Sequence, residues 1–170
     1  IAEPIVRALQ GSDISAPDRL VAALSHYPGQ SEPVSGLERG AMHVSERKLR
    51  EVFLPPWTAG VRDAGALCLM ATYPAINGVA AHNSSWILKD LLRGELSFEG
   101  VVLSEGRGIS TLIDERVVDT QKAAGRLAVQ SGIDVGISFE DAYLLELIES
   151  VREGSVAMAD IDRAVRNILR

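Results

Sequence analysis

The chain has 170 residues, of which 46% are hydrophobic and 24% charged, a composition typical of one globular domain with a sizeable core. Its formal net charge of −6 argues against a general nucleic-acid binder and against a protein that binds anionic membranes, because both gain from neutralising phosphates. No apolar stretch is long enough to cross a membrane, and the one cysteine, Cys68, has no partner for an internal disulfide and is expected in the core.

Short apolar runs alternate along the chain with segments whose apolar residues have helical spacing. Turn and cap residues separate them, among them Ser45 as an N-cap, Pro55-Pro56 as a kink or split, and Asn77-Gly78 as a tight turn. The expected helices are Pro4–Gln10, a segment beginning at Ser45, Ser85–Leu92, Val117–Gln130, Ala142–Glu153 and Met158–Leu169. The expected strands are Leu20–Leu24, Ala66–Thr72, Val101–Leu103 and Ile133–Ile137.

This order of strands and helices predicts an α/β fold with a parallel sheet and right-handed crossovers. Four strands are about half of an eight-stranded barrel, and a free half-barrel would leave two unpaired sheet edges. The chain also begins inside a helix-like segment. We therefore expect residues 1–170 to form about half of a (β/α)₈ TIM-type barrel, the C-terminal part if the family resemblance given below holds, with the remainder supplied by chain outside this segment.

The stretch Gly100–Gly108, GVVLSEGRG, places Glu105 just after a buried strand. In α/β barrels the C-terminal ends of the strands carry the chemistry. A carboxylate there costs free energy unless it is solvated or paired. The plainer alternative is that Glu105 only caps the following turn.

Side chains that follow parallel strands gather at one rim of the sheet. Here that rim is expected to collect His26, Tyr27, Tyr73, Glu105, and Asp134 or Ser138. Taken singly, His26 is also explained as a hydrogen-bonded core histidine, and Tyr73 as a packed residue whose hydroxyl is bonded to a neighbour. His43 and His82 are expected to be solvated in loops. We expect no metal or cofactor, because zinc and calcium spacings and a glycine-rich phosphate loop are all missing.

Five segments carry motifs in a fixed order: SERKLRE at 45–51 with FLPP at 53–56, MATY at 70–73 with ING at 76–78, WILKDLLRG at 86–94, FEGVVLSE at 98–105, and the closing 151–169. In this order they resemble glycoside hydrolase family 3. The resemblance is closer to its β-glucosidase branch than to its N-acetylglucosaminidase branch, whose SDxxxM pattern is absent after Ser104.

The resemblance implies a retaining, exo-acting β-glycosidase, β-glucosidase-like, in which residues 1–170 form the second half of an N-terminal barrel and a second α/β domain lies elsewhere. It implies Glu105 as the nucleophile and His26, Met70, Tyr73 and Ser25 at the sugar pocket. The acid/base is expected in the missing chain. The implied partners are a glycoside or oligosaccharide substrate and the remaining chain of the same protein, with no nucleic acid, membrane or cofactor. The expected location is periplasmic or extracellular rather than cytoplasmic.

The sequence departs from the family pattern at the pocket. Glu105 is one methylene longer than the family aspartate, Ser25 replaces a lysine, Pro74 an asparagine and Gly106 an aromatic residue. The alternative function is therefore a catalytically silent sugar-binding or scaffold homologue. An unrelated barrel with a phosphate site is a weaker third interpretation. Nearby carboxylates are expected to be solvated surface charges: Asp114, Glu115, Glu140 and Asp141. Sugar, linkage and oligomeric state stay open.

Overall fold

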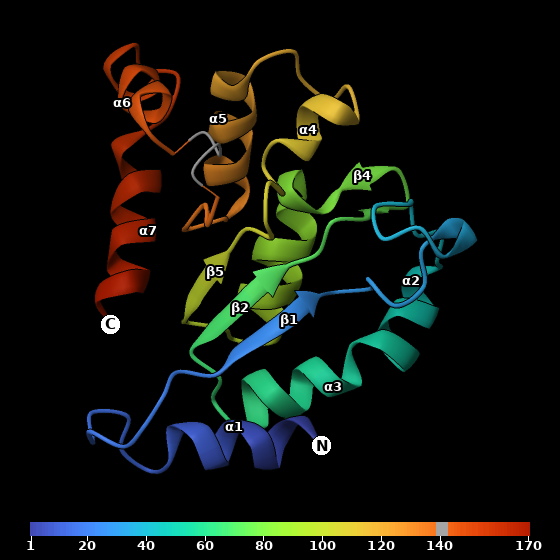
Figure 1. Ribbon diagram of the computed structural model, residues 1–170, viewed down its shortest axis with the longest axis vertical. Helices are drawn as coiled ribbons and strands as arrows, with labels where there is room; N and C mark the ends of the chain where they lie inside the picture. The colour runs from blue at the N-terminus through green and yellow to red at the C-terminus, as the bar shows by residue number, and fades with distance from the viewer. Residues whose placement is uncertain (139–142) are drawn as a thin grey trace.

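In the computed structural model, which describes residues 1–138 and 143–170, helices surround a small parallel sheet (Figure 1). The strands are β1 (Ala23–Tyr27), β2 (Cys68–Ala71), β3 (Ala75–Ile76), β4 (Val79–Ala80) and β5 (Val101–Leu103). The α-helices are α1 (Ala2–Gln10), α2 (Glu46–Lys48), α3 (Pro55–Trp57), α4 (Thr111–Asp114), α5 (Gln121–Ser131), α6 (Leu145–Arg152) and α7 (Met158–Leu169). The 3-10 helices are η1 (Val34–Gly36) and η4 (Ala81–Asn83), and the π-helices are η2 (Leu49–Phe53), η3 (Thr58–Asp63) and η5 (Trp86–Glu95).

Strands β1, β2 and β5 lie side by side and parallel in that order, as Figure 1 shows. Between β1 and β2 the register shifts after Leu24, and the Ser25–His26 peptide bond is cis. The alternation of strands and helices thus produces the predicted parallel sheet, with the C-terminal ends of the strands at one rim.

Two of the expected strands differ from the observed ones. β1 begins at Ala23 rather than Leu20, which is exposed, so His26 lies inside the strand and not after it. The segment expected as the strand Ile133–Ile137 forms a single parallel bridge, between Val135 and Leu103. With this bridge, four segments contribute to the sheet.

The starts of helices α2 and α5 follow their capping residues. Ser45 caps α2 as expected, its Oγ accepting from Lys48 N–H at 3.2 Å, and α3 starts afresh at Pro55. The helix expected from Val117 instead begins at Gln121, because the extended Thr120 caps it, and it ends as expected at a left-handed Gly132.

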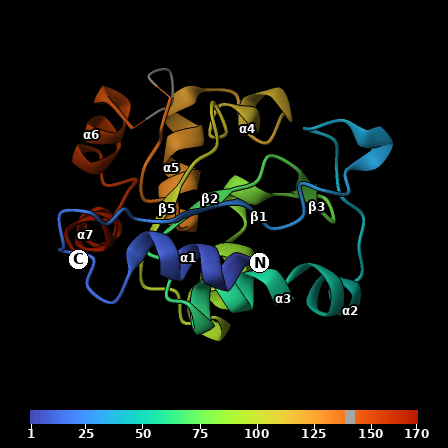
Figure 2. The same cartoon turned by 60° about the horizontal axis from the view of Figure 1, so that its bottom comes forward.

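The core lies between the sheet and its helices. Leu69 of β2 and Val102 of β5 are fully buried against a cluster that includes Leu88 and Leu91 of η5 and Ala128 of α5. Cys68 is buried in β2 as expected. Figure 2, seen from another side, shows α1 alongside the helical segment that follows α3, whereas α5 and α7 pack together at the β5 side.

A small hairpin, β3–β4, follows β2 and folds the chain back over the rim. Its two-residue turn is Asn77-Gly78, with φ of 52° and 85°, as a type I′ turn requires. The Asn77 side chain also accepts from Val44 N–H at 2.8 Å, which ties the hairpin to the segment before α2. The predicted tight turn is confirmed.

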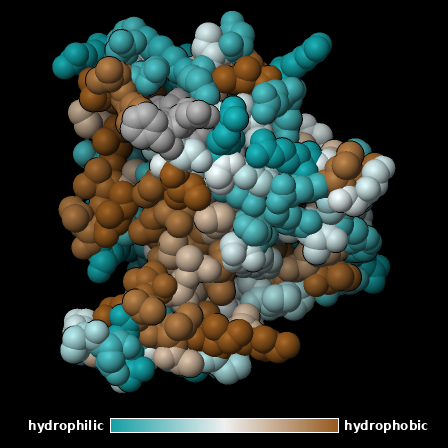
Figure 3. Space-filling model, viewed as in Figure 1, coloured by the Kyte–Doolittle hydropathy of each residue, from teal (hydrophilic) through white to brown (hydrophobic). Residues whose placement is uncertain are grey.

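One face of the molecule exposes many apolar side chains. Figure 3 shows them gathered where Figure 1 places α6, α7 and the lower end of the sheet. Exposed members include Leu145, Ile148, Met158, Ile168 and Leu169. Among the described residues no helix combines the length and apolar character needed to span a bilayer.

Candidate active site

The end of β5 places Glu105 at the rim of the sheet. Ser104 is fully buried; its N–H donates to the Val135 carbonyl at 2.8 Å, and its Oγ accepts from Ile137 N–H at 3.2 Å. These bonds fix the backbone at the end of β5, immediately before Glu105. The Glu105 residue itself is only 6% exposed, so its carboxyl group has little access to solvent.

Two donors reach one oxygen of the Glu105 carboxylate. His26 Nε2 lies 3.1 Å from Oε1, and Gln30 Nε2 donates to the same oxygen at 3.2 Å. The second oxygen, Oε2, is buried and has no hydrogen-bond partner among the described residues. The carboxylate is therefore held asymmetrically, through Oε1.

Burial raises the pKa of Glu105 above its usual value. The Gln30 hydrogen bond opposes that shift most strongly, followed by the charge that His26 carries when protonated, and the Tyr73 backbone amide also favours ionisation. The nearby Glu38 carboxylate raises the pKa further. The neighbours of Glu105 thus act in opposite directions on its pKa, burial and Glu38 raising it and Gln30, His26 and the Tyr73 amide lowering it.

Tyr73 adjoins this carboxylate, as predicted. Its hydroxyl donates to the Gly106 carbonyl, and the Arg39 guanidinium lies 4.2 Å from the centre of its ring. Burial raises the pKa of the phenol, and the Glu105 charge is the second-largest cause of this rise. The phenol therefore stays neutral. The Tyr73 hydroxyl is thus bonded to a neighbour and the residue lies beside Glu105, whereas its place in a sugar pocket stays a prediction.

His82 is not solvated as expected but is 1% exposed directly behind Glu105. The β3–β4 hairpin and η4 fold it inward, where its Nε2 accepts from the Glu105 backbone N–H at 3.2 Å. Burial lowers the pKa of His82 to about 3, so the imidazole is neutral. His43, in contrast, is exposed as predicted.

Ser25 and Met70 make no hydrogen bond or ion pair with the Glu105 carboxylate among the described residues. Ser25 is exposed and lines, with His26 and Gln30, a cavity of about 530 Å³ that Pro56 and Trp57 wall on the helical side. Met70 is half-buried in β2, in register with Leu103. Of the four predicted pocket residues, His26 and Tyr73 are therefore the two that the structure places beside Glu105.

The other rim candidates separate. Asp134 is buried away from the rim in an ion pair with Arg93 at 2.7 Å, and it also accepts from Val102 N–H at 2.9 Å. Ser138 does reach the rim, where its Oγ accepts from Arg107 N–H at 2.6 Å. Of the carboxylates expected to be solvated, Asp114 is exposed, Glu115 is half-buried with its pKa raised by burial, and Glu140 and Asp141 lie outside the described residues.

Three residues at the site were missed from the sequence: Gln30, Thr72 and His82. Gln30 lies between the expected strand Leu20–Leu24 and the helix that begins at Ser45, where no element was predicted, and its contact with Glu105 spans 75 positions. Thr72 follows β2 and donates through Oγ1 to Gln30 Oε1 at 3.1 Å. A polar residue at the C-terminal end of the expected strand Ala66–Thr72 was the one signal available for Thr72.

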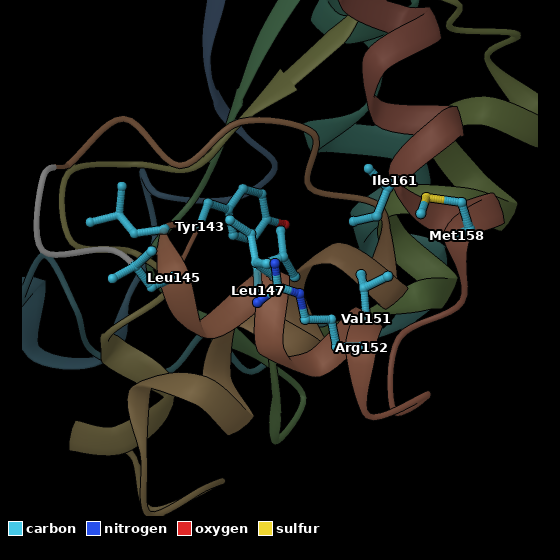
Figure 4. Close-up of a pocket in the computed structure, with 9 residues that line it drawn as sticks. Tyr143, Leu145, Leu147, Val151, Arg152, Met158 and Ile161 are labelled. Carbon is cyan, nitrogen blue, oxygen red and sulfur yellow. The ribbon is translucent and has the colours of Figure 1, made fainter.

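A larger hollow lies between α6 and α7, and its volume is about 760 Å³ (Figure 4). Apolar side chains and Arg152 line it, and none of its lining residues contributes to the site around Glu105. Figure 4 shows Val151, Met158 and Ile161 along one stretch of its wall and Tyr143 and Leu147 along another.

Comparison with known proteins identifies the fold and its family. The model of the glycosyl hydrolase family 3 N-terminal domain matches residues 1–170. A periplasmic β-glucosidase of Salmonella typhimurium is 32% identical over 99% of this chain, which spans 22% of that protein. A solved β-glucosidase from Erythrobacter marinus matches with a TM-score of 0.94 at 29% identity, over 99% of this chain and 22% of that one. A mutant β-glucosidase from Listeria innocua, solved with laminaribiose, matches with a TM-score of 0.91 at 26% identity, over 97% of this chain and 23% of that one.

The α/β architecture is therefore that of a TIM-type barrel domain, of which this chain supplies several parallel strands and their helices. The SERKLRE, MATY, WILKDLLRG and FEGVVLSE motifs and the closing helix lie in the matched range. The chain belongs to glycosyl hydrolase family 3, within its N-terminal domain.

Proposed function

We propose that the protein is a retaining, exo-acting β-glycosidase of β-glucosidase type, with Glu105 as its nucleophile. The observation that carries this proposal is the Glu105 carboxylate at the end of β5, held through Oε1 by His26 and Gln30. Relatives named β-glucosidase, one of them solved with laminaribiose, support a terminal β-linked sugar as substrate.

In the first step a Glu105 oxygen attacks the anomeric carbon of the bound sugar while the glycosidic C–O bond breaks. The leaving oxygen takes a proton from a second carboxylic acid, which then deprotonates the water that releases the sugar. His26 and Tyr73 border the nucleophile, and Ser25 and Met70 are proposed to line the sugar pocket further out. The acid/base is proposed to lie in chain outside residues 1–170.

The same proposal assigns these residues to the second half of the barrel. The chain spans about a fifth of the relatives it matches, and β1 pairs on one side only among the described strands. The apolar hollow between α6 and α7 adds a surface for further chain to cover. A periplasmic or extracellular location is proposed by analogy with the periplasmic relative.

The test is to trap the glycosyl-enzyme on the full-length protein. A 2-deoxy-2-fluoro glucoside with a good leaving group slows release of the sugar, so the labelled peptide can be mapped by mass spectrometry. We expect the label on Glu105 and none in the Glu105→Gln variant. A label on another residue, or full activity of Glu105→Gln, contradicts the assignment.

A catalytically silent sugar-binding homologue is the second candidate function. The enclosed Oε2 of Glu105 and the absence of a cationic side chain at Ser25 favour it. It predicts saturable binding of glucose or laminaribiose by calorimetry, with no hydrolysis of a panel of aryl β-glycosides. Turnover of any of these glycosides that is lost in Glu105→Gln excludes it.

A further inference from the structure

We propose that Thr72 and Gln30 form a positioning relay that orients the Glu105 carboxylate and favours its ionised form. The proposal rests on Glu105 acting as the nucleophile. Thr72 and Gln30 are positioning residues here, because Thr72 acts on the carboxylate through Gln30 and Gln30 acts through Oε1.

The relay begins at a rigid point. Thr72 is 0% exposed and follows the last residue of β2. Its backbone N–H donates to the carbonyl of Tyr27 in β1 at 2.8 Å, which continues the sheet by one bond. The Thr72 side chain therefore projects from a fixed backbone rather than from a loop.

The hydroxyl of Thr72 then selects one orientation of the Gln30 amide. Thr72 Oγ1 donates to Gln30 Oε1 at 3.1 Å, and Gln30 Nε2 donates to Glu105 Oε1 at 3.2 Å. An ionised carboxylate only accepts hydrogen bonds, whereas an amide has a donor end and an acceptor end. Reversing the Gln30 amide would place its carbonyl oxygen against the carboxylate, which is repulsive.

This chain of donors matters because Glu105 is buried. Burial raises its pKa, and the Gln30 hydrogen bond is the largest opposing effect. A nucleophile must be ionised to attack, so the donor that opposes burial also extends activity toward lower pH. Oε2 accepts no hydrogen bond among the described residues, so the orientation of the carboxylate depends on the contacts at Oε1.

The test compares two changes at Thr72 in the full-length protein. Thr72→Val keeps the shape and removes the hydroxyl, whereas Thr72→Ser keeps the hydroxyl. We measure the pH dependence of kcat/KM on an aryl β-glucoside and of the rate of trapping by the fluoro glucoside. The acid limb is the low-pH side of this profile, where the rate falls as the nucleophile is protonated. For Thr72→Val we expect the acid limb to move up by about one pH unit, so that kcat/KM is tenfold lower at pH values well below it. For Thr72→Ser we expect the wild-type acid limb.

A double-mutant cycle tests whether Thr72 acts through Gln30. Gln30→Met has a similar length and no donor, so it should move the acid limb in the same direction as Thr72→Val. In the Gln30→Met background, Thr72→Val should add nothing. The control is Thr58→Val, the same chemical change where the hydroxyl donates to the Leu54 carbonyl within the helix, and it should leave the limb in place.

The possible failures are distinguishable. If the wild type is labelled at Glu105 but Thr72→Val and Thr72→Ser have the same acid limb, or the two changes add fully in the cycle, the relay is wrong and the proposed function stands. If the wild type forms no glycosyl-enzyme and hydrolyses no glycoside, the proposed function fails and the relay fails with it. Circular dichroism on every variant separates a shifted limb from loss of fold, and Gln30→Met alone tests the relay if Thr72→Val does not fold.

Discussion

The backbone N–H of Glu105 donates to Nε2 of His82 across 3.2 Å. Because Nε2 accepts this bond, the proton of the neutral imidazole is assigned to Nδ1, which has no partner among the described residues. The carboxylate proposed as nucleophile is thus fixed from both ends, its backbone by His82 and its side chain by His26 and Gln30.

We expect His82 to make folding stability depend on pH. Its folded pKa, about 3, lies below its unfolded value near 6.5, so the unfolded state takes up a proton first as the pH falls. The contribution of neutral His82 to the free energy of unfolding is fully present above pH 6.5. It falls between pH 6.5 and pH 3 by about 1.4 kcal/mol per pH unit.

Urea unfolding of the wild type and of His82→Gln, at pH values from 7 to 4, checks this. Glutamine does not titrate, so the gap in stability between the two proteins should narrow as the pH falls. Carboxyl groups titrate in both proteins and cancel in the difference. A gap that stays constant over this range would show that His82 is not held neutral.

Gly108 is expected to resist substitution, whereas Gly106 is expected to tolerate it. A Cβ at Gly108 would lie 2.3 Å from His82 Nε2 and 3.0 Å from the Glu105 carbonyl oxygen. A Cβ at Gly106 would meet Tyr73 Oη at an ordinary 3.5 Å. Thermal or urea unfolding should therefore show that Gly108→Ala lowers stability by about 1–3 kcal/mol and Gly106→Ala by much less. Equal effects would contradict the close packing of His82 against Gly108.

Asp134 is expected to carry a large share of local stability. Its buried carboxylate pairs with Arg93, and Asn167 of α7 donates to it at 3.1 Å. Asp134→Ala would leave the largely buried Arg93 charge without its carboxylate counter-ion, with only the Phe98 and Gly100 carbonyls as acceptors among the described residues, at a cost of about 3–5 kcal/mol. The control is Glu99→Ala, which removes an exposed pair with Arg170 and should cost less than about 1 kcal/mol. Similar losses in urea unfolding would argue against this difference.

If Glu105 is the nucleophile, as we propose, Glu105→Asp should slow formation of the glycosyl-enzyme even though it restores the family's usual residue. The contacts of Oε1 with His26 and Gln30 are built for the longer side chain. Shortening it by one methylene withdraws the carboxylate by about 1 Å, which should reduce the trapping rate about 100-fold. Pre-steady-state labelling of both proteins measures this. A faster aspartate variant would mean that the pocket retains the geometry of the shorter nucleophile.

The sheet and the position of Glu105 were predictable because both follow from local patterns. The apolar run Val101–Leu103 is too short for a helix, and the next residues must emerge at the rim once neighbouring strands are parallel. Local capping chemistry likewise fixed Ser45 and Gly132 as helix ends. The start of α5 was missed because the apolar residues before Thr120 extend the helical spacing beyond the cap.

The features that the sequence did not predict depend on packing between segments far apart in the chain. His82 reads as a loop histidine, and its burial follows from the way the β3–β4 hairpin and η4 return to β5. Asp134 seemed to be a rim carboxylate, but Arg93 from η5 draws it below the rim. The contact of Gln30 with Glu105 requires the three strands β1, β2 and β5 to be assembled first, and a single sequence carries no pattern for it.

The parallel order β1-β2-β5 makes the site a late product of folding. Its strands are joined by long crossovers rather than hairpins, so loop-closure entropy must be overcome before any of their hydrogen bonds form. Glu105 meets His26 and Gln30 only after those crossovers have closed. Until then the chain carries a solvated glutamate and unpaired strand edges, so the interval in which it is prone to aggregate is also the interval in which the proposed nucleophile is not yet in place.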